Sequence, residues 1–166
     1  MARGNSFEPN EAGISSVLFY HASIITHGTT PTSIASTPWY WLWGSIDVFN
    51  TNRKDQNISD TSSYLDLAPL YGSSQKDQDL VRAGVGGELK PDTFHDRRLL
   101  AFPPGVSVLL IMYNRFHNHA ARTLKAINEG GRFTPPPSLD PDTAQKWQDE
   151  HLFQVARLSV KLHPKN

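Results

Sequence analysis

The chain has 166 residues, which is long enough for one ordinary domain with a hydrophobic core. Its 16 basic and 16 acidic residues balance, which argues against a nucleic-acid partner or a polybasic membrane anchor. It has no cysteine, which excludes a disulfide framework, a thiolate metal site and a cysteine nucleophile. The amino-terminal residues are polar, so we expect neither a secretory signal nor a transmembrane helix, and a protein that is cytoplasmic or peripheral to intracellular membranes.

The first predicted element is a helix over residues 14–27. Its apolar residues keep the three- and four-residue spacing of one helix face: Ile14, Val17, Leu18, Ala22 and Ile25. Residues 28–46 contain no charged residue and hold three of the four tryptophans: Trp39, Trp41 and Trp43. Their alternation would place three rings on one face of a strand, which predicts either an aggregation-prone surface or an interaction site.

Shorter elements follow a polar stretch. Residues 64–71, with three leucines and Pro69, predict a compact buried loop rather than a regular element. Ser73 or Ser74 then caps a short helix that ends near Gly84. The glycine cluster that begins there predicts a flexible connection.

The longest predicted helix covers residues 104–128, and Gly130 and Gly131 end it. The prolines at 135–137 predict a stiff linker, and Asp142 with Gln145 predicts a capping box before a final helix. The expected buried stripe of the long helix is Val106, Leu109, Leu110, Tyr113, Phe116, Ala120, Leu124 and Ile127. The final helix carries Ala144, Trp147, Leu152, Val155 and Leu158. The chain is therefore predicted to be mainly α with long loops.

Two blocks of the sequence carry a family resemblance. Residues 61–72 read Thr-Ser-Ser-Tyr-Leu-Asp-Leu-Ala-Pro-Leu-Tyr-Gly, and residues 103–106, Pro-Pro-Gly-Val, lead toward Asn-Arg-Phe-His-Asn at 114–118. Both blocks resemble the dioxygenase domain of the fungal psi-producing oxygenases and linoleate diol synthases, in the animal-type haem peroxidase superfamily. The resemblance runs from residue 14 onward, except over 28–46. It implies a partial haem peroxidase domain over residues 1–166, with part of the helical, cyclooxygenase-like fold.

The resemblance also implies a function. The intact family members are haem-dependent dioxygenases that add O2 to a polyunsaturated fatty acid of the linoleate type and form a hydroperoxide, an oxylipin precursor. His27 ends a helix similar to the family's distal helix, so it matches the distal haem histidine, which moves a proton on bound peroxide. Arg97 and Arg98 would bind a haem propionate or the fatty-acid carboxylate, because guanidinium groups bind carboxylates in a bidentate manner. The other interpretation of these arginines is a pair of solvated loop charges.

The first of the two blocks resembles the superfamily's calcium loop. By this match Ser62 offers a hydroxyl and a carbonyl, Tyr64 a carbonyl, and Asp66 a carboxylate, all oxygen donors that calcium prefers. Asp47 would add a second carboxylate if it followed the distal histidine directly. Calcium-binding relatives carry a hydroxyl where this chain has Ala68. The loop therefore either binds calcium or only braces the distal helix.

The chain departs from the family pattern in two places. The aspartate expected after His27 is absent, and removal of residues 28–46 would join His27 to Asp47, which predicts either a retained intron or a genuine loop insertion. The family's Tyr-Arg-Trp-His motif, with the proximal haem ligand and the radical-forming tyrosine, has no match. We therefore expect the proximal half to be absent and the chain alone to be inactive. The alternative function is a catalytically inactive haem- or protein-binding fragment, and a product that does not fold alone is a third interpretation.

Overall fold

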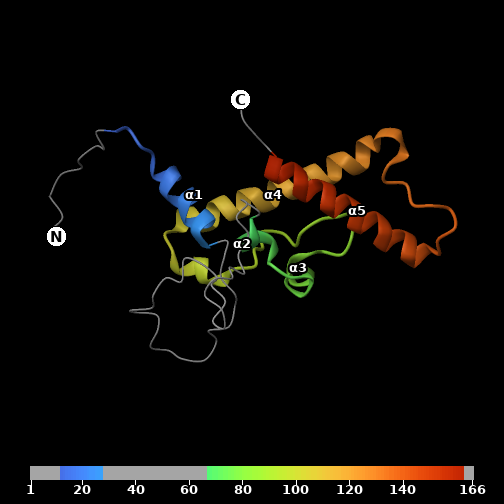
Figure 1. Cartoon of the computed structure of the whole chain (residues 1–166), viewed down its shortest axis with the longest axis horizontal. Coiled ribbons are helices and arrows are strands. Elements are labelled where there is room, and N and C mark those ends of the chain that lie inside the picture. The colour runs from blue at the N-terminus through green and yellow to red at the C-terminus, as the bar shows by residue number, and fades with distance from the viewer. Residues whose placement is uncertain (1–11, 28–66, 163–166) are drawn as a thin grey trace, which may run out of the picture.

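The structure, a computed structural model, describes residues 12–27 and 67–162 (Figure 1). Within this part the chain is mainly α, as predicted: it has five α-helices and two 3-10 helices, and no strand apart from one isolated β-bridge between Arg82 and Leu89. The helices are α1 (Ser16–His27), α2 (Ala68–Tyr71), α3 (Gln75–Val81), η2 (Arg97–Ala101), α4 (Pro104–Ile127), η3 (Glu129–Gly131) and α5 (Pro141–Leu162). No helix in the described ranges is long and apolar enough to cross a bilayer.

The helices α4 and α5 pack against each other and cross obliquely in the view of Figure 1. Pro103 and Pro104 start α4, where their missing N–H groups leave no bond unmade. The helix ends at Ile127, and Asn128, its C-cap, adopts the left-handed conformation at φ 39°. Its side-chain amide then binds the turn, since its Oδ1 accepts from Phe133 N and its Nδ2 donates to Thr134 Oγ1, both at 2.9 Å. An asparagine, rather than the predicted glycines, therefore provides the helix stop.

The helix α1 packs against the amino-terminal half of α4. Gly105 permits this approach, because a Cβ at that position would lie 2.2 Å from the ring of Tyr20. The hydroxyl of Tyr113 lies 3.4 Å from Nδ1 of His21. The apolar residues at helical spacing in α1 do not form its buried side, where Ser23 and Ile24 lie instead. The apolar residues of the predicted helix lie in exposed positions: Ile14, Val17, Leu18, Ala22 and Ile25.

The short helix α2 packs against α4 and α3, and the segment at 82–96 is joined to α4 and α5 by hydrogen bonds. The predicted buried loop is confirmed in burial at residues 68–71, which form one helical turn, α2, preceded by Leu67 at φ 53°, whereas residues 64–66 lie outside the described residues. The predicted cap of α3 is confirmed at Ser74, and the helix ends at Val81 rather than at Gly84. The core combines these elements: Ile24, Leu70, Tyr71, Val81, Leu89, Leu99, Val106, Leu110 and Phe153.

Two further details of the long helices differ from the prediction. The cap of α5 is Asp140, not Asp142, because the Asp140 carboxylate accepts from Thr143 N at 3.0 Å. The buried face of α4 differs from the predicted apolar stripe: it includes polar residues, and Phe116 and Ile127 of the stripe are exposed. The buried residues of α4 are Val106, Leu110, Asn114, His117, Asn118 and Ala121.

The capping box of α3 provides a test of local stability. The Ser74 hydroxyl accepts from Asp77 N, and the Asp77 carboxylate accepts from Ser74 N, both at 3.2 Å. We expect Ser74→Ala to lower the free energy of unfolding by about 1 kcal/mol, since one helix-end N–H loses its acceptor. Urea unfolding followed by circular dichroism measures this. The neighbouring Ser73→Ala is the control, and equal losses in the two variants would contradict the assignment of the cap.

Candidate functional site

The residues predicted to hold haem lie at the border of the described structure. His27 is the last residue of α1, and its side chain lies outside the described part. Arg97 begins η2 and is exposed. Arg98 follows it in η2, and its side chain is again outside the described part. Their roles toward haem therefore stay predictions.

The predicted calcium ligands fall outside the described residues altogether. These are Asp47, Ser62, Tyr64 and Asp66. The described chain resumes at Leu67, directly after the last of them. Among the described residues, no group of three or more His, Asp or Glu side chains is placed to hold a metal ion. Calcium binding stays a prediction as well.

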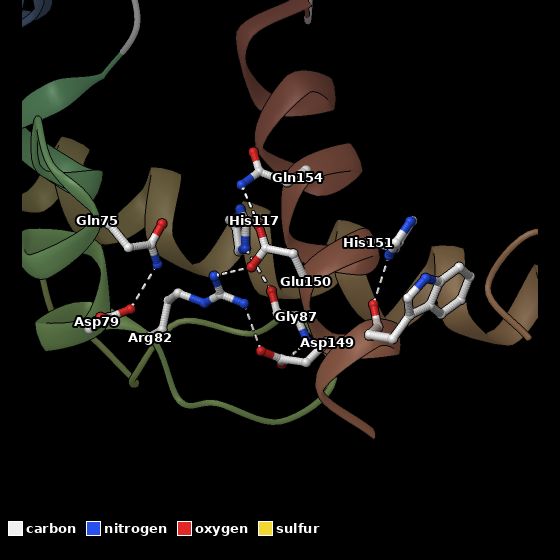
Figure 2. A network of polar contacts seen from close by, with 10 residues as sticks. Gln75, Asp79, Arg82, Gly87, His117, Asp149, Glu150, His151 and Gln154 are labelled. Carbon is white, nitrogen blue, oxygen red and sulfur yellow. Dashed lines mark hydrogen bonds and ion pairs between the residues drawn. The ribbon is translucent and has the colours of Figure 1, made fainter. Parts of the chain in front are cut away.

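The described structure instead contains a buried polar network centred on His117 of α4 (Figure 2). Its Nε2 lies 2.9 Å from the carbonyl oxygen of Gly87, and its Nδ1 lies 3.0 Å from the hydroxyl of Tyr71. The carbonyl can only accept, so Nε2 carries the hydrogen and Nδ1 accepts from the phenol. The ring of Phe153 on α5 closes the third side, with its centroid 5.3 Å away. One imidazole thus joins α2, the segment at 82–96, α4 and α5.

Arg82 forms the second centre of the network. Its guanidinium binds two neighbouring carboxylates of α5, with 2.7 Å to Asp149 Oδ2 and 2.5 Å to Glu150 Oε2 (Figure 2). Its Cζ also lies 4.2 Å from the ring centroid of Phe153, a cation–π arrangement. The second oxygen of Asp149 accepts from Gly87 N at 2.7 Å. Gly87, which was predicted to lie in a flexible connection, is therefore buried, and both its N–H and its carbonyl group are hydrogen-bonded.

Two asparagines of α4 fasten the rest of the segment. Asn118 makes a reciprocal pair with the backbone of Leu89: its Oδ1 accepts from the N–H at 2.8 Å, and its Nδ2 donates to the carbonyl at 3.0 Å. Asn114 Nδ2 donates to the carbonyl oxygens of Lys90 and Thr93, at 3.0 and 2.8 Å. These side chains replace the backbone partners that a strand would supply, and buried backbone groups require such partners.

The electrostatics keep this network neutral at its centre. Burial lowers the pKa of His117 to about 4, and the charges of Arg82 and Arg157 act in the same direction, against the bond to Gly87. Burial likewise raises the pKa of Tyr71 above its usual value, although the charge of Arg157 opposes this. Burial also disfavours the charged form of Arg82, but its bonds to Glu150 and Asp149 outweigh this and raise its pKa. The imidazole and the phenol are therefore both uncharged at neutral pH.

The network includes residues that the sequence interpretation passed over: Tyr71 as a hydrogen-bond donor, Arg82, Asn118 and Asp149. One signal was available. Asn114, His117 and Asn118 recur at three- and four-residue spacing, so they share one face of α4 with buried apolar residues. A polar stripe within an apolar face indicates partners elsewhere in the fold. Arg82 and Asp149 gave no comparable local signal, since their contact spans 67 positions.

Comparison with known proteins shows consistent similarity to one group of fungal enzymes. The chain is 52% identical over 150 residues to psi-producing oxygenase A of Aspergillus fumigatus, and this match covers 90% of this chain and 12% of that protein. It is 47% identical over 152 residues to the linoleate diol synthase of Gaeumannomyces graminis, covering 92% of this chain and 11% of that protein. It is also 55% identical over 133 residues to a bifunctional dioxygenase–epoxy alcohol synthase of Fusarium oxysporum, covering 77% of this chain and 10% of that protein.

The chain is homologous to the fungal psi-producing oxygenases and linoleate diol synthases. This confirms the family resemblance predicted from the two sequence blocks. The chain spans about an eighth of the length of its A. fumigatus relative. No family model matches the chain, and no solved structure matches it.

Within this psi-producing-oxygenase homologue, the segment at 114–118 that carries the resemblance provides the buried polar face of α4. Its histidine is neutral, fully buried and saturated with hydrogen bonds. Such a group positions backbone and does not act as a base toward an external substrate. The described network therefore holds α2, the segment at 82–96, α4 and α5 together.

The buried pair of Arg82 and Asp149 can be compared with an exposed pair in the same chain. Their side chains are 9% and 7% exposed, whereas those of Arg115 and Asp92 are 69% and 47% exposed, at a similar 2.7 Å. Arg82→Met should lower the free energy of unfolding by about 3 to 5 kcal/mol, because it leaves a buried carboxylate unpaired. Arg115→Met should change it little, since solvent screens that pair. Chemical unfolding of both variants measures the contrast, and similar losses would refute it.

The depressed pKa of His117 predicts a stability that falls in acid. The unfolded imidazole, with a pKa near 6.5, takes up a proton that the folded one binds only near pH 4. The contribution of the buried neutral imidazole to the free energy of unfolding is therefore complete above about pH 6.5. It declines toward pH 4, by up to about 3 kcal/mol. His117→Gln, whose amide can replace both hydrogen bonds, should show a flatter decline between about pH 7 and pH 4.5. Parallel profiles of the unfolding free energy for the two proteins would contradict this.

Proposed function

We propose that this chain forms part of a haem-dependent dioxygenase that oxidises a polyunsaturated fatty acid of the linoleate type with O2 to a hydroperoxide. The observation that carries the proposal is the identity of about one residue in two with psi-producing oxygenase A over nine-tenths of the chain. The name of the G. graminis relative, linoleate diol synthase, supports the class of substrate. The chain would contribute the distal side of the haem site.

The proposal gives this chain's residues distinct tasks. His27 would hold and return a proton on the distal side, because a neutral imidazole accepts and donates one near physiological pH. Arg97 and Arg98 would bind carboxylates, either those of haem or that of the fatty acid. The donor set fits haem in its chemistry: one imidazole and two guanidinium groups suit an iron porphyrin with anionic edges. Haem, when bound, supplies the redox chemistry of the reaction.

The packing of α1 supports the assignment of a distal role. This helix carries His27 at its carboxyl end, and α4 holds it through Gly105 and Tyr20. The same α4 bears the buried His117 network on a neighbouring face. A catalytic imidazole requires a rigid support to keep its geometry within a fraction of an ångström. The calcium loop is proposed as a second brace, with Asp47, Ser62, Tyr64 and Asp66 as its oxygen donors.

The alternative is a catalytically inactive haem- or protein-binding role. The observation that favours it is the exposed apolar surface of α1, where Val17, Leu18 and Phe19 are 53%, 56% and 61% exposed. Apolar groups gathered in this way are typical of contact surfaces. A Soret band in the purified chain with added haem, together with no oxygen uptake in any context, would select this role.

A chimaera tests the proposed enzyme function. Psi-producing oxygenase A of A. fumigatus would receive this chain in place of its homologous segment, once complete and once without residues 28–46. We expect the shortened version to consume O2 with linoleate, because removal joins His27 to Asp47 as in the family pattern. We expect the complete version to be weaker if those residues are a retained intron and equally active if they are a genuine insertion.

Point variants of the active chimaera assign the distal role. His27→Ala should lower the rate by a factor on the order of a hundred or more, since a positioned acid–base group contributes about that much. The exposed His119→Ala on α4 is the matched control and should leave the rate unchanged. The Soret band separates loss of haem from loss of proton transfer. An active His27→Ala protein would overturn the assignment, and inactivity of both chimaeras with haem bound would overturn the proposed function.

A further inference from the structure

The Tyr71–His117 pair is a phenol hydrogen-bonded to an imidazole base in a site closed to water. Both side chains are fully buried, and the two atoms lie 3.0 Å apart. The tautomer is set by the second bond of the ring, because Nε2 donates to Gly87 O at 2.9 Å. The lone pair of Nδ1 therefore faces the phenolic hydrogen. This arrangement provides a proton acceptor already in place for any reaction that acidifies the phenol.

We propose that Tyr71 is a redox-active tyrosine, which gives up one electron to an oxidant while its phenolic proton passes to Nδ1 of His117. The O–H bond breaks, the Nδ1–H bond forms, and the oxidant is reduced by one electron. The products are a neutral tyrosyl radical and an imidazolium that still donates to Gly87. Return of one electron reverses both changes. The oxidant is a one-electron acceptor of high potential, and its identification with a peroxide-treated haem rests on the proposed function.

The electrostatics of the site permit this proton shift. An oxidised phenol is a far stronger acid than an imidazolium, even one whose pKa is as low as the value of about 4 that burial imposes on His117. The new positive charge would face the guanidinium groups of Arg82 and Arg157. Asp149 and Glu150 neutralise the first of these through bonds of 2.7 and 2.5 Å. Burial also leaves the proton no solvent acceptor, so it remains available to recombine with the radical.

A second phenol–imidazole pair in the chain provides an internal comparison. Tyr113 and His21 lie 3.4 Å apart and are only partly buried. The longer separation weakens the hydrogen bond, and access of water offers the proton other acceptors. Of these two pairs, Tyr71–His117 alone is both short and closed. An oxidised protein without haem should therefore retain a long-lived radical at Tyr71 and not at Tyr113.

The test uses the purified full chain without haem, with photogenerated tris(bipyridine)ruthenium(III) as an outer-sphere oxidant. Electron paramagnetic resonance, with ring-deuterated tyrosine incorporated, identifies a tyrosyl signal. We expect Tyr71→Phe to lose the slowly decaying signal and Tyr113→Phe to keep it. A variant with the other four tyrosines replaced by phenylalanine leaves the network intact and should also keep it, so a folding defect in Tyr71→Phe does not decide the result.

His117→Gln separates a proton acceptor from a merely structural neighbour. The amide can accept from the phenol and donate to Gly87, but it is not a base. Radical formation should slow by a factor on the order of a hundred or more, while circular dichroism shows a folded protein. The proposal is overturned if the wild type gives no tyrosyl signal, if the protein with Tyr71 as its only tyrosine gives none, or if His117→Gln reacts as fast as the wild type. Because no haem is present, failure of the haem assignment leaves this result unaffected.

Discussion

The described structure depends on the chain of hydrogen bonds that runs from Tyr71 through His117 and Gly87 to Asp149 and Arg82. An unsatisfied buried donor or acceptor costs about 1 to 3 kcal/mol, which is a large part of a domain's net stability. The Tyr71 hydroxyl needs the imidazole, and the imidazole needs the carbonyl of Gly87. The N–H of Gly87 needs Asp149, and Asp149 needs Arg82. Each bond thus fixes the next element, so α2, the segment after α3, α4 and α5 have one mutual arrangement.

Apolar packing alone would not place the segment at 82–96 so specifically. It contributes Leu89 to the core, and a single leucine side chain can be satisfied in several orientations. The amides of Asn114 and Asn118 remove this freedom, because they bind backbone groups at fixed points along the segment. Gly87 completes the arrangement at φ 71°, where an added Cβ would lie 2.5 Å from Phe153 N. Close approach to α5, and not flexibility, is therefore what requires glycine here.

The sequence predicted where helices lie better than which faces they bury. The Ser74 cap and the long helix begun by prolines follow local rules, and both are present. In α1 the polar and apolar residues are not separated on opposite sides, so periodicity could not distinguish the side that meets Gly105 and α4. The polar face of α4 was missed because its partners lie in a segment that only the fold brings close. The predicted haem and calcium residues lie beyond the described side chains, except for Arg97, so the same reasoning does not reach them.

The helix α4 links the two parts of the proposed distal site. One side of it receives α1 at Gly105 and Tyr113, and the adjoining side receives α2 at His117. The first contact holds the helix that ends at His27, and the second holds the turn that follows the predicted calcium loop. Neither contact uses any residue between 27 and 67. The positions of α1 and α2 are therefore determined by their contacts with α4. An insertion or deletion between residues 27 and 67 need not alter these contacts, on which a distal histidine would rest.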